Sequence, residues 1–406
     1  MPSDKESLID MLSDESCWNS FYNYKASLAL PKAFEKELKG FIDEKKYLPV
    51  VRRINDGDSF PLPKKSVISK LSSQKKRTVY TYPADENIVL KLLTYLVLRR
   101  YDYLFCDNLY SFRPGLNAKD AIRKLSSIEE ISGMYSYKVD ISNYFNSIPV
   151  PKLLPMLDEV LGDDPKLLKF LRSLLEETNV LDRGVVTTDT KGIMAGTPMS
   201  SFYANLYLRG LDRYFADRDI PYARYSDDII LFAKSRGEID RHAAFIKRYL
   251  SDYGLLINPD KEFYSEPSKQ WTFLGFSFKE NTIDIAPATV KKLKQKMRRK
   301  ANALMRWSTR NNLSGEKAAT AFIRIFNRKL LESSDDNDLT WSYWFFSVIN
   351  TTEGLHTIDE YAQDCIRYLV SGKHTKSRYN VRYDDIKKLG YKSLVHAYYN
   401  FNKDKK

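Results

Sequence analysis

Cysteine and histidine are scarce in this chain, with three and four residues respectively among 406. The cysteines, Cys17, Cys106 and Cys365, are far apart and odd in number, which excludes a disulfide framework and the paired spacing of a zinc site. The histidines are isolated, and no P-loop, HExxH or GxGxxG motif occurs. The chain therefore lacks the usual signatures of Walker-type nucleotide binding, zinc proteolysis and dinucleotide binding.

Long apolar runs are missing as well. The longest candidate, residues 88–98, is interrupted by Lys91 and Thr94 and is too short to span a membrane. Residues 1–6 are polar and do not form the apolar core of a signal peptide. We therefore expect a cytoplasmic protein without a membrane partner.

The chain is rich in basic and aromatic residues. It carries 65 Lys and Arg against 52 Asp and Glu, a formal net charge of +13, together with 28 Tyr and 21 Phe. Such a surface favours a polyanion whose bases can stack, although charge alone is equally typical of a merely well-hydrated protein. The length predicts two or three subdomains.

Four Asp-Asp pairs occur, at 163–164, 227–228, 335–336 and 384–385. Only Asp227 and Asp228 lie within strand-forming sequence, residues 223–233, whereas the other pairs lie in polar loops or at helix ends. The flanks predict a β-hairpin with Ser226 and Asp227 as its two-residue turn. Two such carboxylates repel each other and lose hydration unless a cation neutralises them, and Mg²⁺ is the natural candidate.

A third carboxylate, Asp140, ends a predicted strand within residues 134–148 and is followed by Tyr144 and Phe145. A lone Asp at a strand end is most often a turn or cap residue, and Asp140 precedes Asp227 by 87 positions, so a meeting would be tertiary. If Asp140 does meet the hairpin, the converging carboxylates provide what two-metal phosphoryl transfer requires.

Three further segments suggest a binding cleft. Residues 64–82 alternate like a hairpin that carries Lys and Arg toward its turn, which suits phosphate binding or, equally, an exposed basic hairpin. Residues 111–115 predict a fixed turn that presents Arg113. Residues 192–201 form a loop of small residues that a base or sugar could approach closely. Other expected elements are helices within 1–60, at 88–105, 150–180, 202–216 and 242–253, a strand at 254–261 and a short hairpin at 272–278.

The composition changes after Pro287. Residues 291–310 carry nine Lys and Arg and no acid. Their apolar stripe predicts a helix with one basic face, either a wall that follows a phosphate backbone or a solvated surface; its members are Val290, Leu293, Met297, Ala301 and Leu304. An aromatic segment at 341–346 and a second basic patch at 373–382 follow.

Taken together, the ordered motifs resemble those of the reverse transcriptases. They are Asp140 with Phe145, residues 196–201 through Asn205, Tyr225 through Asp228, Gly254 with Lys261, and Phe273 with Leu274 and Gly275. The resemblance covers roughly residues 61–280. It implies an α+β right-hand polymerase with fingers, a ferredoxin-like palm and a helical thumb. The implied divisions are a helical N-terminal extension (1–60), fingers and palm (61–285) and a basic helical thumb and C-terminal region (286–406).

The resemblance also implies an RNA-templated DNA polymerase and a role for each matching residue. Asp140, Asp227 and Asp228 would be catalytic and, with the backbone carbonyl of Ile141, would bind two Mg²⁺ ions. The substrate-binding set, for deoxynucleoside triphosphates, is Arg77, Lys70, Phe145, Gly196, Pro198 and Lys261. In this set Phe145 would exclude the 2′-hydroxyl and Lys261 would donate a proton to pyrophosphate. Phe273, Leu274 and Gly275 would support the primer end of a DNA/RNA hybrid.

Within the family, the short Pro198-to-Asn205 spacing is of the retron type, but residues 117–121 lack the retron histidine and no Val-Thr-Gly follows. Residues 355–359 and 390–395 look similar to the phage-defence-associated reverse transcriptases of bacteria. That resemblance implies a dedicated structured non-coding RNA as template. The alternatives are a polymerase of the same fold that works without a template or copies RNA into RNA, and a maturase-like RNA-binding protein. The sequence does not predict an oligomeric state.

Overall fold

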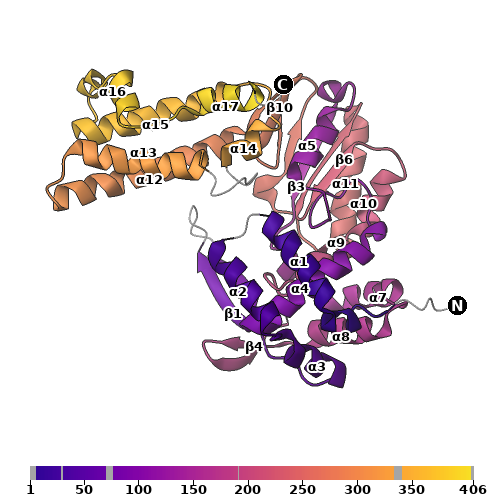
Figure 1. The fold of residues 1–406 in the computed structure, drawn as a ribbon. Helices are drawn as coiled ribbons and strands as arrows, with labels where there is room; N and C mark the ends of the chain where they lie inside the picture. The colour runs from indigo at the N-terminus through magenta and orange to yellow at the C-terminus, as the bar shows by residue number, and fades with distance from the viewer. Residues whose placement is uncertain (1–5, 29–30, 70–75, 191, 333–340, 404–406) are drawn as a thin grey trace. The chain divides into compact units, whose positions relative to one another are not determined.

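The computed structural model describes residues 6–28, 31–69, 76–190, 192–332 and 341–403. The chain forms two compact units, Met1–Pro267 and Ser268–Lys406 (Figure 1). The divisions expected near residues 60 and 285 remain a prediction. Of the helices in the described ranges, none is long and apolar enough to cross a membrane.

Helices fill the first sixty residues, as predicted. They are α1 (Glu15–Ser27), α2 (Lys32–Asp43) and α3 (Tyr47–Asp56), and α1 and α3 pack against α4 (Ala84–Arg100). The buried ring of Trp18 stacks on Tyr47 at 4.8 Å between centroids, so large aromatic side chains hold α1 to α3. Helix α4 begins four residues before the predicted start, directly after Pro83, where proline has no N–H to lose.

A four-stranded sheet of order β2-β1-β4-β5 follows. The predicted basic hairpin is confirmed as β1 (Lys64–Ser69) and β2 (Lys76–Thr81), paired from Lys64↔Thr81. A second hairpin, β4 (Asn179–Asp182) and β5 (Val185–Thr188), was not predicted, and it joins β1 through a short parallel pairing of β4. Its strands have four residues each and polar ends, so their alternation is too short to identify from sequence.

The second sheet of this unit is antiparallel, with strand order β6-β7-β3-β8. Its strands are β6 (Tyr222–Tyr225), β7 (Asp228–Ala233), β3 (Tyr135–Asp140) and β8 (Phe263–Ser265). Helix α11 (Arg236–Asp252) packs against β3 and β7. The remaining helices of the unit are α5 (Ala118–Ser126), α6 (Tyr144–Ser147), α7 (Val150–Val160), α8 (Pro165–Glu176), α9 (Ser200–Tyr207) and α10 (Arg209–Ala216).

Two predicted elements of this region were wrong in form. Residues 254–261 do not make a strand: Ile257 forms a single bridge to Ile141, and Pro259–Lys261 is a 3₁₀ turn. Proline cannot donate a ladder hydrogen bond, which explains why the strand is not formed. The helix predicted at 202–216 begins at Ser200 and is interrupted at Leu208, between α9 and α10.

The second unit begins with a three-stranded meander, β9 (Trp271–Phe273), β10 (Phe276–Lys279) and β11 (Thr282–Ile285). The predicted hairpin at 272–278 is therefore confirmed. Helices α12 (Pro287–Arg310), α13 (Gly315–Leu330) and α15 (Glu353–Ser371) pack together, and α14 (Trp341–Phe346), α16 (Tyr383–Lys388) and α17 (Leu394–Lys403) complete the unit. On α12 the predicted stripe buries Val290, Met297 and Ala301. With its antiparallel palm sheet, the finger-like sheet and a helical second unit, the chain has the α+β right-hand polymerase fold.

Candidate active site

The site begins with the turn between β6 and β7. Tyr225 pairs with Asp228, which leaves Ser226 and Asp227 as the predicted two-residue turn. Ser226 adopts the left-handed conformation with φ of 61°, which is unfavourable for a residue with a Cβ. The short turn places Asp227 at the end of the hairpin and Asp228 as the first residue of the next strand.

Asp140 meets this hairpin across the sheet. It is the last residue of β3 and lies opposite Asp228 in the β3–β7 register. The next residue, Ile141, donates its N–H to the carbonyl oxygen of Asp227 at 3.0 Å. Directly opposed residues of antiparallel strands place their side chains on the same face, with Cβ atoms about 4.5–5.5 Å apart. The structure therefore brings together all three carboxylates that the sequence analysis singled out.

This concentration of charge is poorly hydrated. Burial, together with repulsion from Asp227 and Asp140, raises the pKa of Asp228 to about 6, although the Lys138 charge opposes the rise. Burial and the Asp140 charge also raise the pKa of Asp227, against weaker opposing effects of Lys261 and Arg77. Asp140 itself is only 4% exposed. Because the ionised forms are destabilised, a cation at this position would be strongly favoured.

Lys261 already supplies one positive charge to the site. Its Nζ atom lies 2.5 Å from Oδ2 of Asp140. Burial acts to lower the pKa of Lys261, but the hydrogen bond to Asp140 and the charges of Asp140, Asp228 and Asp227 outweigh it, and the pKa is raised. The ammonium group is therefore held in its protonated form beside the carboxylates, as a proton donor requires.

The donors fit a hard divalent cation in their chemistry. Carboxylate and backbone carbonyl oxygens are the ligands that Mg²⁺ accepts, and Asp140, Asp227, Asp228 and the carbonyl of Ile141 provide them. Within the described part of the chain, no three His, Cys, Asp or Glu side chains are already grouped closely enough to hold a metal ion. Metal binding would therefore require side-chain movement within this carboxylate group.

The nucleotide side of the site is formed by β2 and the small-residue loop. Arg77 lies on β2, is exposed, and acts electrostatically on Asp227. Tyr80 of the same strand donates its N–H to Ala195 at 2.9 Å, which attaches β2 to the loop. Gly196 is exposed at φ of 103°, and a Cβ there would lie 3.0 Å from the carbonyl oxygen of Tyr80. Pro198 follows and is half-buried, whereas Lys70 lies outside the described residues.

Asn146 joins these parts and was missed in the sequence analysis. Its amide Nδ2 donates to the carbonyl oxygen of Thr78 at 3.3 Å, and its Oδ1 accepts from the N–H of Ala195 at 2.9 Å. One buried side chain therefore connects the Arg77 strand and the loop of Gly196 to α6. Its position directly after Phe145 is the only sequence signal, and both of its partners are distant in the chain.

Phe145 has an aromatic neighbour that the sequence did not predict. The half-buried Phe145 ring meets Phe112 edge-on at 6.2 Å between centroids. Phe112 is 38% exposed and has φ of 56°, a conformation rarely adopted by a bulky residue. The prediction that the following residue, Arg113, is presented for binding was wrong. Its guanidinium is buried and makes a two-pronged ion pair with Asp102, with N–O distances of 2.8 and 2.9 Å.

The residues expected to support a primer lie in the second unit. Leu274 and Gly275, both with positive φ, form the turn between β9 and β10, and the carbonyl oxygen of Gly275 accepts from Ala286 at 2.8 Å. The Phe273 side chain is fully buried. Any primer contact at Phe273 would therefore involve its backbone.

Comparison with known proteins identifies the family. Residues 62–278 match the family described as "Reverse transcriptase (RNA-dependent DNA polymerase)", which is more than half of the chain. The chain belongs to the reverse transcriptase family. It is 25% identical over 238 residues to the retron Ec86 reverse transcriptase of Escherichia coli, which covers 57% of this chain and 68% of that protein. This reverse transcriptase is therefore an RNA-directed DNA polymerase that binds RNA, and the expected likeness to a bacterial enzyme is supported.

More distant similarities also exist. A protein of Schizosaccharomyces pombe, named "Uncharacterized 91 kDa protein in cob intron", is 28% identical over 149 residues, which covers 36% of this reverse transcriptase and 18% of that protein. Among solved structures, an apo telomerase of Candida tropicalis gives a TM-score of 0.46 at 12% identity, over 55% of both chains. A Candida albicans telomerase in complex with a telomeric RNA fragment gives 0.44 at 14% identity, over 81% of this chain and 62% of that one.

Proposed function

We propose that this reverse transcriptase copies a dedicated structured non-coding RNA into DNA as part of bacterial defence against phage. We further propose that Asp140, Asp227 and Asp228, with the carbonyl of Ile141, hold two Mg²⁺ ions for this reaction. The observation that carries the chemical part is the meeting of three carboxylates at one end of β3 and β7, fixed by the Asp140↔Asp228 register and the Ile141–Asp227 hydrogen bond.

In the proposed reaction, the primer 3′-hydroxyl oxygen forms a bond to the α-phosphorus of the incoming nucleotide. The bond from that phosphorus to the bridging oxygen of pyrophosphate breaks, and the hydroxyl proton is lost to solvent. Bound Mg²⁺ ions would supply charge neutralisation for the attacking and leaving oxygens. Lys261, protonated beside Asp140, donates a proton from Nζ to the departing pyrophosphate.

Other side chains bind and select the nucleotide in this proposal. Arg77 binds the triphosphate through its charge, on a strand that is joined to the Gly196 loop by the Tyr80–Ala195 hydrogen bond. The absence of a side chain at Gly196 leaves room for the substrate to approach the backbone. Phe145, supported by Phe112, would occupy the space that a 2′-hydroxyl requires and thereby select deoxyribonucleotides.

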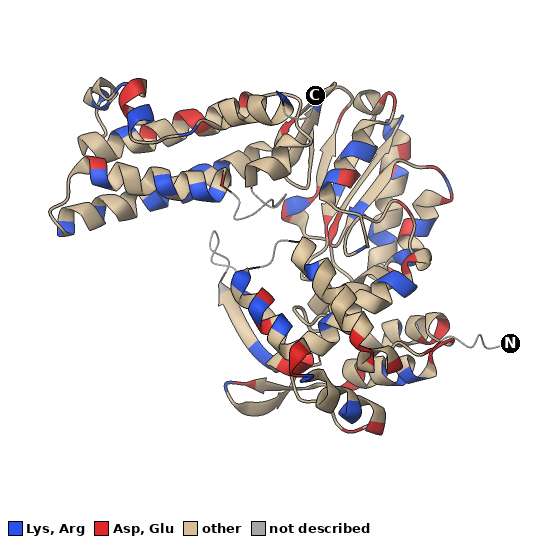
Figure 2. Ribbon diagram, viewed as in Figure 1, with Lys and Arg blue, Asp and Glu red and all other residues tan. Residues whose placement is uncertain are grey.

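The exposed face of α12 supports the binding of a structured RNA. Figure 2 shows basic residues repeated along this helix. The exposed members are Lys291, Lys292, Lys296, Arg298, Arg299, Lys300, Arg306 and Arg310. Trp307 of the same helix is 44% exposed and offers a ring for an unpaired base. Cations at this density suit a phosphate backbone, and binding of this kind weakens steeply with salt.

The second basic patch, residues 373–382, gives weaker support. Its Arg378 is engaged within the unit, donating to Asp364 at 3.3 Å and to the carbonyl of His374 at 2.8 Å. This guanidinium is therefore less available to a phosphate than the cations of α12.

The two segments that resemble the phage-defence group contact each other. Buried Asp359, from residues 355–359, accepts hydrogen bonds from the hydroxyls of Tyr391 and Ser393 at 2.7 and 2.6 Å. It also accepts from the N–H groups of Leu394 and Val395 at the start of α17. The two segments therefore form one structural feature, which supports treating them as a single marker of the proposed subgroup.

Primer extension with the purified protein and its co-purifying RNA tests the proposal. The bound RNA and the DNA product are sequenced, and each nucleotide is also supplied alone. We expect one RNA species to be enriched over bulk RNA and to match the product. Equal extension with and without template would instead indicate a template-independent polymerase. Cells expressing wild-type protein or Asp227→Asn are then challenged with phage, and equal survival would contradict the defence role.

A further inference from the structure

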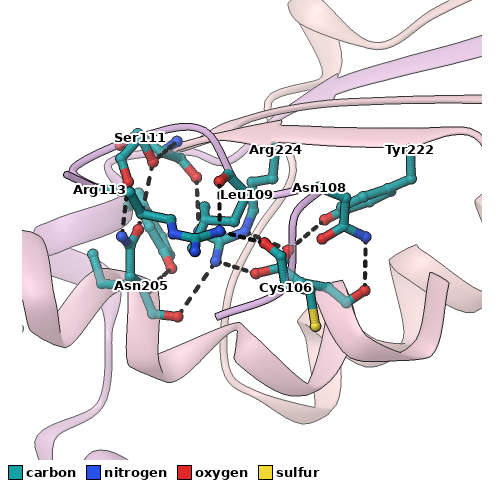
Figure 3. A network of polar contacts seen from close by, with 12 residues as sticks. Cys106, Asn108, Leu109, Ser111, Arg113, Asn205, Tyr222 and Arg224 are labelled. Atoms are coloured by element: carbon teal, nitrogen blue, oxygen red, sulfur yellow. Dashed lines mark hydrogen bonds and ion pairs between the residues drawn. The ribbon is translucent and has the colours of Figure 1, made fainter. Parts of the chain in front are cut away.

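An ion pair is buried beneath the turn that carries Asp227. The side chain of Arg224, on β6, is fully buried, and that of Asp212, on α10, is 1% exposed. Nε of Arg224 lies 2.8 Å from Oδ1 of Asp212 and Nη2 lies 2.5 Å from Oδ2, so the pair is two-pronged. The hydroxyl of Tyr222 also donates to Oδ1 of Asp212, at 3.0 Å. Figure 3 shows this region, with Arg224 between Asn205 and Tyr222.

Stability alone does not explain such a pair. Replacing a buried ion pair by well-packed apolar residues is often neutral or even stabilising, because both charges lose their hydration on folding. What distinguishes Arg224 is the direction of its remaining donors. Nη1 donates to the carbonyl oxygen of Ser226, and Nη2 donates to the carbonyl oxygen of Asn205, each at 3.3 Å. Arg224 therefore binds the residue that directly precedes Asp227.

The other backbone group of Ser226 is held from the opposite direction. Its N–H donates to Oγ of Ser111 at 2.8 Å. Ser111 is in turn held by Asn205, whose Nδ2 donates to the Ser111 carbonyl at 2.8 Å and whose Oδ1 accepts from Oγ at 3.4 Å. Ser111 and Asn205 are both fully buried, so this support is fixed by the surrounding packing.

The geometry of the turn shows why this support is needed. Ser226 adopts the left-handed conformation at φ of 61°, and a residue with a Cβ keeps that conformation only when its surroundings impose it. Both its N–H and its carbonyl are bound by side chains from distant segments. Without these partners the backbone at residue 226 could relax, and the Asp227 side chain would change direction.

We propose that Ser111 and Arg224, aligned by Asn205 and Asp212, are positioning residues that fix the direction of Asp227 for nucleotide addition. The proposal rests on the proposed catalytic role of Asp227. These residues act beneath the turn and do not touch the residues proposed to bind triphosphate or sugar, Arg77, Phe145 and Gly196. Loosening the turn should therefore lower kcat and leave the KM for deoxynucleotide unchanged.

The size of the effect follows from the sensitivity of catalysis to position. A displacement of about 1 Å at a reacting centre costs on the order of 100-fold in rate. Ser111→Ala removes one of the two bonds that hold Ser226 and leaves the other. We therefore expect kcat to fall by about 10–100-fold, with KM for each deoxynucleotide within about twofold of wild type.

Tyr222→Phe provides a matched control. Like Ser111→Ala, it removes one buried hydroxyl, but that hydroxyl contacts Asp212 and not the turn. The aromatic ring, which stacks on Phe215 at 4.6 Å, is retained. The two variants should lose similar thermal stability, so kinetics are measured for all proteins well below the lower unfolding temperature.

The test compares steady-state kinetics and amide hydrogen exchange of the 222–228 segment. We expect Ser111→Ala to lower kcat alone and to speed exchange of the Ser226 amide, and Tyr222→Phe to do neither. Equal kcat values for the two variants, or a fall in kcat that is matched by a rise in KM, would overturn the proposal. Should Ser111→Ala fail to fold, Arg224→Lys is used with the same expected split, since it keeps the charge but loses the contacts to Ser226 and Asn205. Asp227→Asn is assayed in parallel: full activity in that variant would refute the catalytic assignment itself, whichever result Ser111→Ala gives.

Discussion

Removing one negative charge at Asp228 should stabilise the metal-free protein while impairing its activity. The Asp228 pKa is raised to about 6, first by burial and then by the charges of Asp227 and Asp140. A carboxyl whose pKa is higher in the folded than in the unfolded chain destabilises the fold whenever it is ionised. Asp228→Asn keeps the side-chain shape and removes that charge.

The magnitude follows from the size of the pKa shift. A rise from 3.8 to about 6 is about two units, equivalent to about 3 kcal/mol of folding free energy at neutral pH. Because the new amide must also find hydrogen-bond partners, we expect a net gain of about 1–3 kcal/mol. In a folded unit of 267 residues this corresponds to a rise in unfolding temperature of roughly 2–10 °C.

Thermal unfolding in EDTA at several pH values measures this gain. Below the unfolded pKa, near pH 3.8, the carboxyl is protonated in both states, so the two proteins should have nearly equal stability. The difference should grow between about pH 4 and pH 6, where Asp228 ionises in the unfolded but not the folded chain, and stay constant above. Added Mg²⁺ should raise the unfolding temperature of the wild type more than that of Asp228→Asn, since binding to the folded state stabilises it.

Asp219→Asn is the control for loss of a charge as such, because Asp219 is exposed. It should leave the unfolding temperature unchanged within about 1 °C, as surface substitutions usually do. If Asp228→Asn were less stable than the wild type in EDTA at pH 7.5, the carboxylate would be favourably solvated in the folded chain. The argument for a cation-requiring carboxylate group would then fail.

Four further predictions concern activity. Asp227→Asn should reduce DNA synthesis by roughly three orders of magnitude or more and leave RNA binding intact; wild-type extension rates would disprove the assignment. Phe145→Ala should admit ribonucleotides, measured as the ratio of kcat/KM for each sugar, and an unchanged ratio in a folded variant would show that Phe145 is not a gate. Asn146→Ala leaves the buried N–H of Ala195 unpaired, so KM for deoxynucleotides should rise about 5- to 100-fold (about 1–3 kcal/mol), whereas Asn143→Ala, an exposed neighbour, should not change it. Reversing charge at Lys296, Arg299 and Lys300 together should reduce enrichment of the bound RNA more than extension on an artificial primer-template, and an unchanged RNA profile would argue against RNA binding by α12.

Local sequence was sufficient for the catalytic hairpin. The β-branched and aromatic residues on both sides of Ser226 and Asp227 favour paired strands, and the polar pair between them favours a turn, so both strands and the position of Asp227 could be predicted. The α12 stripe was equally readable, since its spacing of three and four residues depends only on the helical period.

Elements with weak local preference were the ones missed. The β4–β5 hairpin has strands of four residues, and it is stabilised by pairing with β1, more than a hundred positions earlier in the chain. The strand expected at residues 254–261 failed because one proline outweighed the flanking apolar residues. Arg113 was expected to face a ligand, but Asp102 and buried carbonyl groups hold it. Whether a polar residue faces solvent or a buried partner depends on packing that composition does not contain.

By itself, the sequence determined the motif order, the hairpin that carries Asp227 and the candidate chemistry, because each depends on residue types that are close together in the chain. Only the tertiary structure decided that Asp140 lies opposite Asp228, that Asn146 joins the Arg77 strand to the Gly196 loop, and that Arg224 and Ser111 hold Ser226. These are single hydrogen bonds and register pairs between segments tens to more than a hundred residues apart. Their free energies of about 1 kcal/mol each are realised only after the core has fixed both partners, so no local pattern in the chain could reveal them.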